Sequence, residues 1–232
     1  MKRFKAVYLV LVGFLIGGAM SSALASDNFG ELNVKAGVNL CTDLNLKLNG
    51  QDSKDGEYGS KPCASFAGEF LIPAEHLVSS LDFLKFGVGL KYLTSAKIIP
   101  NWSFTFNGES QKLSYLPIYF TLQINPFVRS NEESLKGLFV KGDIGYNAYF
   151  SSNLKKVYHF YDQDEVELSV KDKGGLYYAF GAGYEFPFGV VFDITYGVYK
   201  SSFEWNSNNS EPYKFKVTNS CVGLNVGYKF KI

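Results

Sequence analysis

The sequence predicts an all-β fold, an eight-stranded antiparallel up-and-down transmembrane β-barrel. Apolar residues recur at every second position in eight separate stretches, the residues between them are polar or glycine, and the chain begins with a secretion signal. A period of two is typical of a β-strand with two unlike faces. Because no helix is predicted to cover the apolar faces, we expect them to contact lipid.

The first 25 residues predict a secretory signal peptide, which precedes a barrel domain over residues 26–232. Three basic residues open the chain, residues 6–20 are mostly apolar, and a small-x-small site places cleavage between Ala25 and Ser26. The apolar run is short for a membrane-spanning helix, which favours a cleaved signal over an uncleaved anchor.

The composition agrees with a barrel and gives no sign of nucleic-acid binding. Without its first 25 residues the chain has 20 basic and 22 acidic residues, and no basic stripe that would bind nucleic acid. Mean hydropathy is near zero. This value fits a barrel, whose strands interleave lipid-facing residues with polar ones.

The eight strands are predicted at residues 31–41, 63–72, 84–95, 113–126, 138–151, 175–186, 189–202 and 215–232. Each reaches the roughly 9–11 residues that a tilted strand needs to cross a bilayer. On the apolar parity, the first four strands carry Leu32, Val34, Ala36, Val38 and Leu40, then Phe66, Phe70 and Ile72, then Leu84, Phe86, Val88, Leu90 and Tyr92, then Leu116, Ile118, Phe120, Leu122 and Ile124.

The last four strands repeat the pattern, and no charged residue interrupts the apolar parity between the first and last apolar residues named for each strand. A Lys or Arg on the lipid face at the bilayer midplane costs about 2–4 kcal/mol, so this absence favours lipid contact. The apolar residues are Leu138, Val140, Ile144 and Tyr146, then Leu176, Tyr178, Phe180, Tyr184 and Phe186, then Val190, Phe192, Ile194, Tyr196 and Val198, then Val222, Leu224, Val226, Tyr228, Phe230 and Ile232.

Charged residues occupy the opposite parity, which we expect to face the lumen near the inner, periplasmic side. An eight-stranded barrel is only wide enough for side chains to fill, and unpaired charges there are costly, so Lys–carboxylate pairs are expected. The predicted lumen charge network consists of Lys35, Glu69, Lys85, Lys141, Asp143, Glu185, Asp193, Lys229 and Lys231.

Inward-facing tyrosines are predicted above this network, toward the outer side. Two interpretations stay open: a packed plug, or a cup that binds a small apolar or aromatic ligand. The tyrosines are Tyr115, Tyr119, Tyr149, Tyr177 and Tyr199.

A soluble lipocalin-like barrel or a β-sandwich also shows apolar–polar alternation. The many glycines on the polar parity, however, suit a crowded lumen better than a solvated surface.

Four segments resemble the small eight-stranded outer-membrane barrels of the opacity, OmpX and OmpA-transmembrane type, although that family usually ends in Phe and this chain ends in Ile. The segments are Tyr115-Leu-Pro-Ile-Tyr-Phe-Thr-Leu, Gly142-Asp-Ile-Gly-Tyr, Gly181-Ala-Gly-Tyr-Glu-Phe and Tyr228-Lys-Phe-Lys-Ile232.

This resemblance implies a monomer in the outer membrane, surrounded by outer-membrane lipid and lipopolysaccharide. The outer loops would be residues 42–62, 96–112, 152–174 and 203–214. Two of them contain hairpin-like segments that could bind an extracellular protein or host factor by strand addition, or else form an aromatic belt that packs on itself. The aromatic contact candidates are Trp102, Phe104, Phe106, Tyr158 and Phe160.

Cysteines flank the first outer loop. If Leu40 pairs with Ala64, then Cys41 lies directly opposite Cys63, and a cross-strand disulfide becomes possible in an oxidising compartment. Closing this loop would contribute about 3 kcal/mol. The alternative is a staggered register with two free thiols, and Cys221 is expected to be a small inward filler.

The sequence offers little catalytic chemistry, and we expect no enzyme, cofactor or metal site. Its two histidines, His76 and His159, are predicted on opposite sides of the membrane, and the common metal, nucleophile and nucleotide motifs are absent. The expected function is an envelope-structural or adhesin role through the outer loops. The alternative is a narrow porin or small-ligand barrel, and a surface enzyme that uses His159 is a third possibility.

Overall fold

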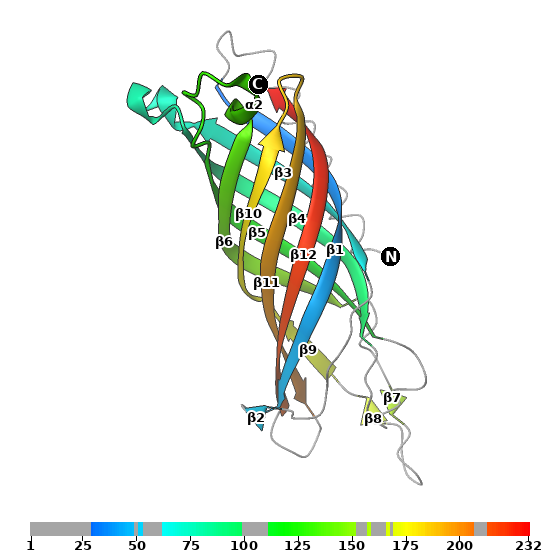
Figure 1. The fold of residues 1–232 in the computed structure, drawn as a ribbon. Coiled ribbons are helices and arrows are strands. Elements are labelled where there is room, and N and C mark those ends of the chain that lie inside the picture. Colours follow the sequence, from blue (N-terminus) through cyan, green and yellow to red (C-terminus); the bar gives the residue numbers. More distant parts are fainter. Residues whose placement is uncertain are drawn as a thin grey trace.

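Long strands form a closed antiparallel β-barrel in the computed structural model (Figure 1). The structure describes residues 29–48, 51–52, 62–98, 111–151, 157–158, 166–167, 169–206 and 213–232. The predicted signal peptide, with Ala25 and Ser26, lies outside these residues and stays a prediction.

Eight strands make the wall, as predicted, and each pairs with its neighbours along the chain. The β1–β12 and β10–β11 ladders complete the closed barrel. The strands are β1 (Glu31–Leu48), β3 (Cys63–Pro73), β4 (Leu84–Ile98), β5 (Gln111–Ile124), β6 (Leu138–Ser151), β10 (Gly175–Glu185), β11 (Val190–Asn206) and β12 (Tyr213–Lys231).

Shorter elements lie at the two ends of the barrel. Three short helices lie at the inner end, near the top of Figure 1: η1 (Ala74–His76), η2 (Ser79–Leu81) and α2 (Glu133–Lys136). None of the helices in the described part of the chain is long and apolar enough to cross a membrane. Four short strands lie at the outer end: β2 (Gln51–Asp52), β7 (Val157–Tyr158), β8 (Val166–Glu167) and β9 (Ser169–Lys173).

The two parities of each strand face opposite environments, as the alternation predicts. Phe180 and Ile144 are 63% and 61% exposed on the outer surface of the wall, whereas Lys35 and Glu69 are only 4% and 2% exposed inside it. A surface this apolar is stable in lipid and costly in water. The barrel therefore carries a lipid-facing band.

The turns at the inner end are held by local hydrogen bonds. The tightest turn places Gly189 at a φ of +91°, a conformation that glycine adopts readily, and its N–H donates to the Phe186 carbonyl at 2.9 Å. In the neighbouring turns Arg129 donates to both carboxylate oxygens of Asp82 and to the Ser80 carbonyl. The hydrogen bond from Arg129 lowers the pKa of the Asp82 carboxyl.

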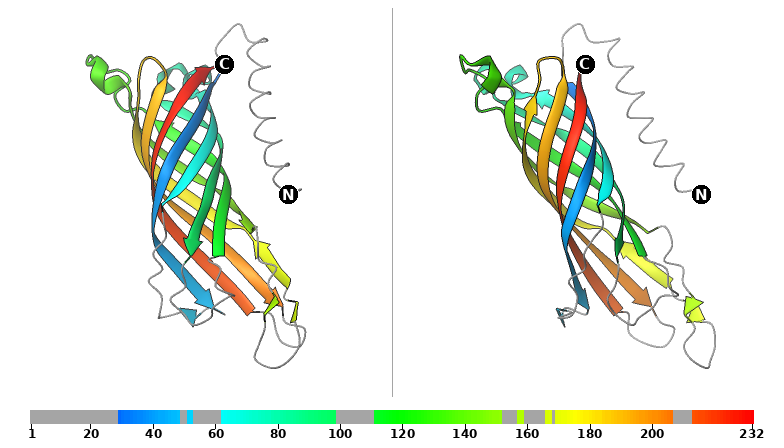
Figure 2. Two further views of the ribbon diagram at one scale, coloured as in Figure 1. Left: turned by 90° about the vertical axis from the view of Figure 1, so that its right-hand side faces the viewer. Right: turned by 45° about the vertical axis from the view of Figure 1, so that its right-hand side comes forward.

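The wall is much taller on one side at the outer end. The β1–β12 ladder continues to the Leu48–Phe215 pair, and β9 adds a further strand to β11. In contrast, β3 begins at Cys63, opposite Asn39, so β1 beyond Asn39 has no β3 partner. We call the resulting extension of β1, β12, β11 and β9 the raised sheet; it lies at the bottom of Figure 2, where the outer end of the barrel points down. Because of this extension, β1, β11 and β12 are longer than predicted.

The register of β1 and β3 corrects the predicted disulfide. Asn39, not Cys41, pairs with Cys63, so the two predicted partners are offset by two residues. Cys41 instead lies directly opposite Cys221 in the β1–β12 ladder and is bonded to it. Cys63 is a buried free thiol. Cys221 is therefore not a filler but half of a covalent bond across the seam between the first and last strands.

Loss of the seam disulfide should reduce stability, because this bond joins residues 180 positions apart. In the chain-entropy model, a loop of this length corresponds to about 5 kcal/mol. We expect Cys221→Ser to lower the temperature at which the detergent-solubilised barrel unfolds, followed by heat-dependent mobility in gels. Cys63→Ser is the matched control and should unfold near the wild-type temperature. Equal loss in both variants, or a Cys41–Cys63 peptide in non-reducing digests, would contradict the assignment.

Candidate functional site

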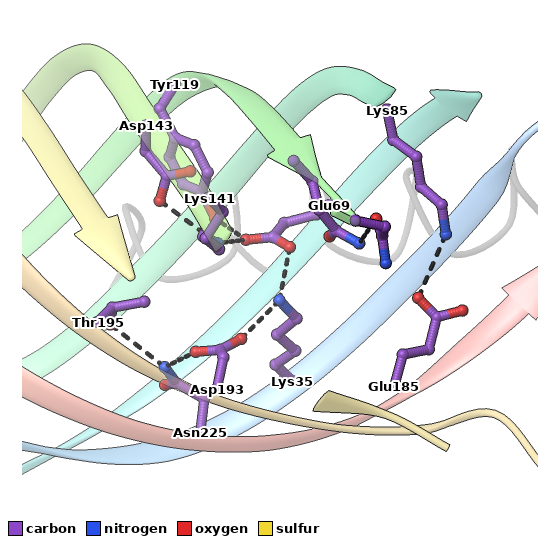
Figure 3. Close-up of polar contacts among 12 residues, drawn as sticks. Lys35, Glu69, Lys85, Tyr119, Lys141, Asp143, Glu185, Asp193, Thr195 and Asn225 are labelled. Carbon is purple, nitrogen blue, oxygen red and sulfur yellow. Dashed lines mark hydrogen bonds and ion pairs between the residues drawn. The ribbon is translucent and has the colours of Figure 1, made fainter. Parts of the chain in front are cut away.

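Buried ion pairs occupy the middle of the lumen and converge on Glu69 of β3 (Figure 3). Lys35 Nζ lies 2.7 Å from one Glu69 oxygen and 2.7 Å from Asp193, while Lys141 Nζ lies 2.5 Å from the other Glu69 oxygen and 3.4 Å from Asp143. These five side chains come from β1, β3, β6 and β11, which meet only because the barrel closes. We call them, together with Lys91, the central cluster.

A second group of ion pairs lies at the inner mouth of the lumen and is called the mouth cluster. Lys85 Nζ lies 2.7 Å from Glu31 and 3.2 Å from Glu185. Lys229 lies 3.4 Å from Glu31 and also contacts Glu185. Each lysine therefore bridges the same two carboxylates, which come from β1 and β10.

Both clusters are electrically neutral. The mouth cluster has two lysines and two carboxylates. The central cluster sets Lys35, Lys141 and the buried Lys91 against three carboxylates, and Lys91 Nζ donates to the Asn39 amide oxygen at 3.2 Å. Charges this deeply buried are tolerated when each is paired and hydrogen-bonded. The described part of the lumen therefore has no fixed excess charge that would favour one sign of ion.

Neutral side chains donate further hydrogen bonds to Glu69 and Asp193, whereas the buried Asp143 Oδ1 has no hydrogen-bond partner among the described residues. The Tyr119 hydroxyl donates to Glu69 at 2.9 Å, and the Asn225 amide donates to Asp193 at 2.6 Å and lies 3.4 Å from the Thr195 hydroxyl. Tyr119 brings in β5 and Asn225 brings in β12. Together the two clusters and these partners include side chains from all eight strands of the wall.

Four tyrosines pack together on the outer side of the central cluster. Tyr115, Tyr119, Tyr177 and Tyr199 are each at most 4% exposed. Their rings form a chain with centroid distances of 5.4 Å between Tyr115 and Tyr199, 5.0 Å between Tyr199 and Tyr177, and 5.3 Å between Tyr177 and Tyr119. These distances are typical of packed aromatic pairs. The four rings thus cover one another instead of lining an open cup. The side chain of Tyr149, the fifth predicted member, lies outside the described residues.

The structure brings together eight of the nine residues predicted for the charge network. The ninth, Lys231, is exposed at the inner rim and forms no ion pair with any described residue, which corrects its assignment to the lumen. Sequence reasoning did not assign Glu31 or Lys91 to the network, although both share the inward parity. It gave no sign of Asn225, since an amide on the lumen parity does not reveal its partner.

The loop candidates are mostly beyond the described ranges. Trp102, Phe104, Phe106, Phe160 and His159 lie outside them, and for Tyr158 only the backbone is described, in the β7–β8 pair. Within the described ranges, no three His, Cys, Asp or Glu side chains gather in an arrangement that would hold a metal ion.

Comparison with known proteins places this geometry in a class of folds. No family model and no curated protein matches the chain. The outer membrane protein AlkL, solved in DMPC lipid bilayers, aligns over 90% of this chain and 93% of its own with a TM-score of 0.52 and 17% identity. The chain is an eight-stranded outer-membrane β-barrel. An outer-membrane location agrees with this fold, and in barrels of this kind the end with short turns faces the periplasm.

Two further outer-membrane proteins align with lower scores. OprG of Pseudomonas aeruginosa covers 88% of this chain and 97% of its own, with 15% identity and a TM-score of 0.47. Ail, the attachment invasion locus protein of Yersinia pestis, solved with the heparin analogue sucrose octasulfate, covers 87% and 99%, with 14% identity and a TM-score of 0.39.

Removal of the shared carboxylate should destabilise the barrel strongly. Glu69→Gln leaves Lys35 and Lys141 without the charge that both contact, and breaking one side of a buried ion pair typically costs about 3–5 kcal/mol. We expect a corresponding drop in the free energy of unfolding, measured by urea titration in lipid vesicles. The control is Lys173→Gln, which breaks the exposed Lys173–Glu204 pair and should cost at most about 1 kcal/mol. Similar losses in both variants would contradict the account.

Proposed function

We propose that this barrel is a non-enzymatic surface protein, which contacts an extracellular protein or host factor through its raised outer sheet. The observation that carries the proposal is a one-sided sheet extension above a lumen that is filled with paired side chains. Because the lumen is filled, we expect a partner to bind at the outer surface of the barrel. The raised sheet is the largest described structure on that side.

The lumen supports a structural role for the barrel interior. A solute that travels along the axis would have to displace the packed tyrosines and then separate Glu69 from Lys35 and Lys141. Both steps expose buried polar groups without partners, which is costly. This favours a plugged barrel over the alternative of a narrow porin or a small-ligand cup.

The raised sheet supports an interaction role, because it offers strand edges. On one side, β1 continues from Leu40 toward β2 at Lys47 with no β3 partner among the described residues. On the other side, β9 pairs with β11 and ends the sheet. Edge strands present unpaired N–H and C=O groups that bind extended segments of partner chains. The expected partner is therefore a protein with an accessible extended segment.

The plugged lumen predicts that the protein does not form channels. Purified wild-type barrel in planar lipid bilayers should give no steady single-channel current, because the tyrosine layer and the central cluster block the axis. The Tyr177→Ala, Tyr199→Ala variant removes two of the packed rings and is the comparison that should show increased conductance if it folds. Steady wild-type channels of uniform size would contradict the plug.

The raised sheet predicts where surface binding is lost. Replacing residues 204–214 by an Asn-Gly turn shortens the β11–β12 hairpin, from the Glu204–Lys214 pair outward, and leaves the membrane part of the ladder intact. Cells that display this variant should bind immobilised serum and matrix proteins less than cells with the wild type. The control variant replaces residues 99–110, which link β4 to β5 and include Trp102, Phe104 and Phe106, by the same turn and should bind as the wild type does. Unchanged binding after the first replacement, with surface display verified, would refute this role of the sheet.

A further inference from the structure

We propose that the inner mouth of the barrel binds the head group of an anionic phospholipid from the periplasmic leaflet, with its phosphate beside Lys231 and Lys136. A pocket of about 720 Å³ opens there. This volume lies within the range of roughly 300–1,000 Å³ that is typical of small-molecule sites. The proposal is independent of the role assigned to the raised outer sheet.

The pocket joins the lumen mouth to the lipid-facing wall. Lys85, Glu185 and Lys229 of the mouth cluster line it, and so do Tyr228 and Phe230 on the apolar parity of β12. Such a site is wet and charged on one side and apolar on the other. A phospholipid has the same division, since its charged head group is joined directly to its acyl chains.

Aromatic rings mark the level of the head groups at this end. Tyr228 and Phe230 pack edge to face at 4.9 Å, and Phe186 lies 4.7 Å from Tyr184 and 5.2 Å from Phe188, measured between ring centroids. Phe188 is 65% exposed at the tip of the tight turn. Aromatic girdles of this kind lie at the membrane–water interface of outer-membrane barrels. The pocket therefore lies at the depth of the inner-leaflet phosphates.

The charges that line the pocket leave two lysines available for a phosphate. Glu185 is already paired with Lys85 and Lys229, and Asp82 is paired with Arg129. The remaining carboxylate belongs to Glu133, which pairs with Lys136 at the surface. The side chains of Glu133 and Lys136 are 83% and 39% exposed, so water screens this pair.

Lys231 is the cation best placed to bind. It is exposed, lines the pocket, and forms no ion pair within the described part of the chain. A lysine ammonium binds phosphate as a compact point charge with three donors. Next to the aromatic wall, Lys231 can contact a phosphate whose acyl chains lie along Tyr228 and Leu224, which are 45% and 53% exposed to lipid.

Native mass spectrometry of the full-length barrel tests the proposal. Protein taken from vesicles of equal parts phosphatidylglycerol and phosphatidylcholine should retain phosphatidylglycerol preferentially. The Lys136→Gln, Lys231→Gln variant should retain about thirtyfold less of it, because each lysine near an anionic membrane surface strengthens binding by about fivefold. Both substitutions are at exposed positions, and heat-dependent gel mobility confirms that the variant is folded.

The control is the Lys173→Gln, Lys200→Gln variant, which removes two exposed lysines at the outer end and should retain the lipid as the wild type does. An additional arm supplies millimolar inorganic phosphate, which should not displace the lipid, because free phosphate makes no contact with the aromatic wall. Equal retention by the inner-end variant and the wild type would overturn the proposal. Equal loss in both variants would do so too, and displacement by inorganic phosphate would overturn the assignment to a lipid.

Discussion

The Glu69 carboxylate is the interaction on which the interior of this barrel depends. It contacts two lysines and a tyrosine hydroxyl, which reach it from β1, β6 and β5. Because the lumen is too narrow for bulk water, each of these groups can be buried only if the others are present. The charges of the central cluster can therefore be neutralised only when the wall is closed, because their partners come from different strands.

A disulfide bond and the raised sheet both lie at the seam between the first and last strands of the wall. The Cys41–Cys221 bond joins the first and last strands, which are the pair farthest apart in sequence and hence the most costly to bring together by chain entropy alone. The raised sheet of β1, β12, β11 and β9 extends from the same seam. The covalent bond therefore lies at the base of the raised sheet, where stiffness would favour the proposed binding of a partner to an edge strand.

The fold and the composition of the lumen were predictable because strand alternation separates the side chains that face lipid from those that face the lumen. One parity carries all four of Lys35, Glu69, Lys141 and Asp193. Charged side chains on that parity are buried in the lumen and are stable there only as ion pairs. Cross-strand register was not predictable, since a shift of two residues keeps every side chain on its face. This is why the Cys41–Cys63 pairing was wrong while the lipid face was right. Lys231 was misassigned for a related reason: parity gives the side of the wall but not where the lumen ends.

The central claim is that the lumen holds Lys35 and Lys141 in ion pairs away from water. Nitrogen-detected NMR of the Lys35 and Lys141 ammonium groups, in lipid nanodiscs, measures this directly. Side-chain ammonium protons that are buried and paired with carboxylates exchange slowly with water and give observable signals. We expect slow exchange for both lysines and fast exchange for Lys231 in the same sample. Fast exchange at Lys35 and Lys141 in the folded barrel would show a water-filled lumen and contradict the account.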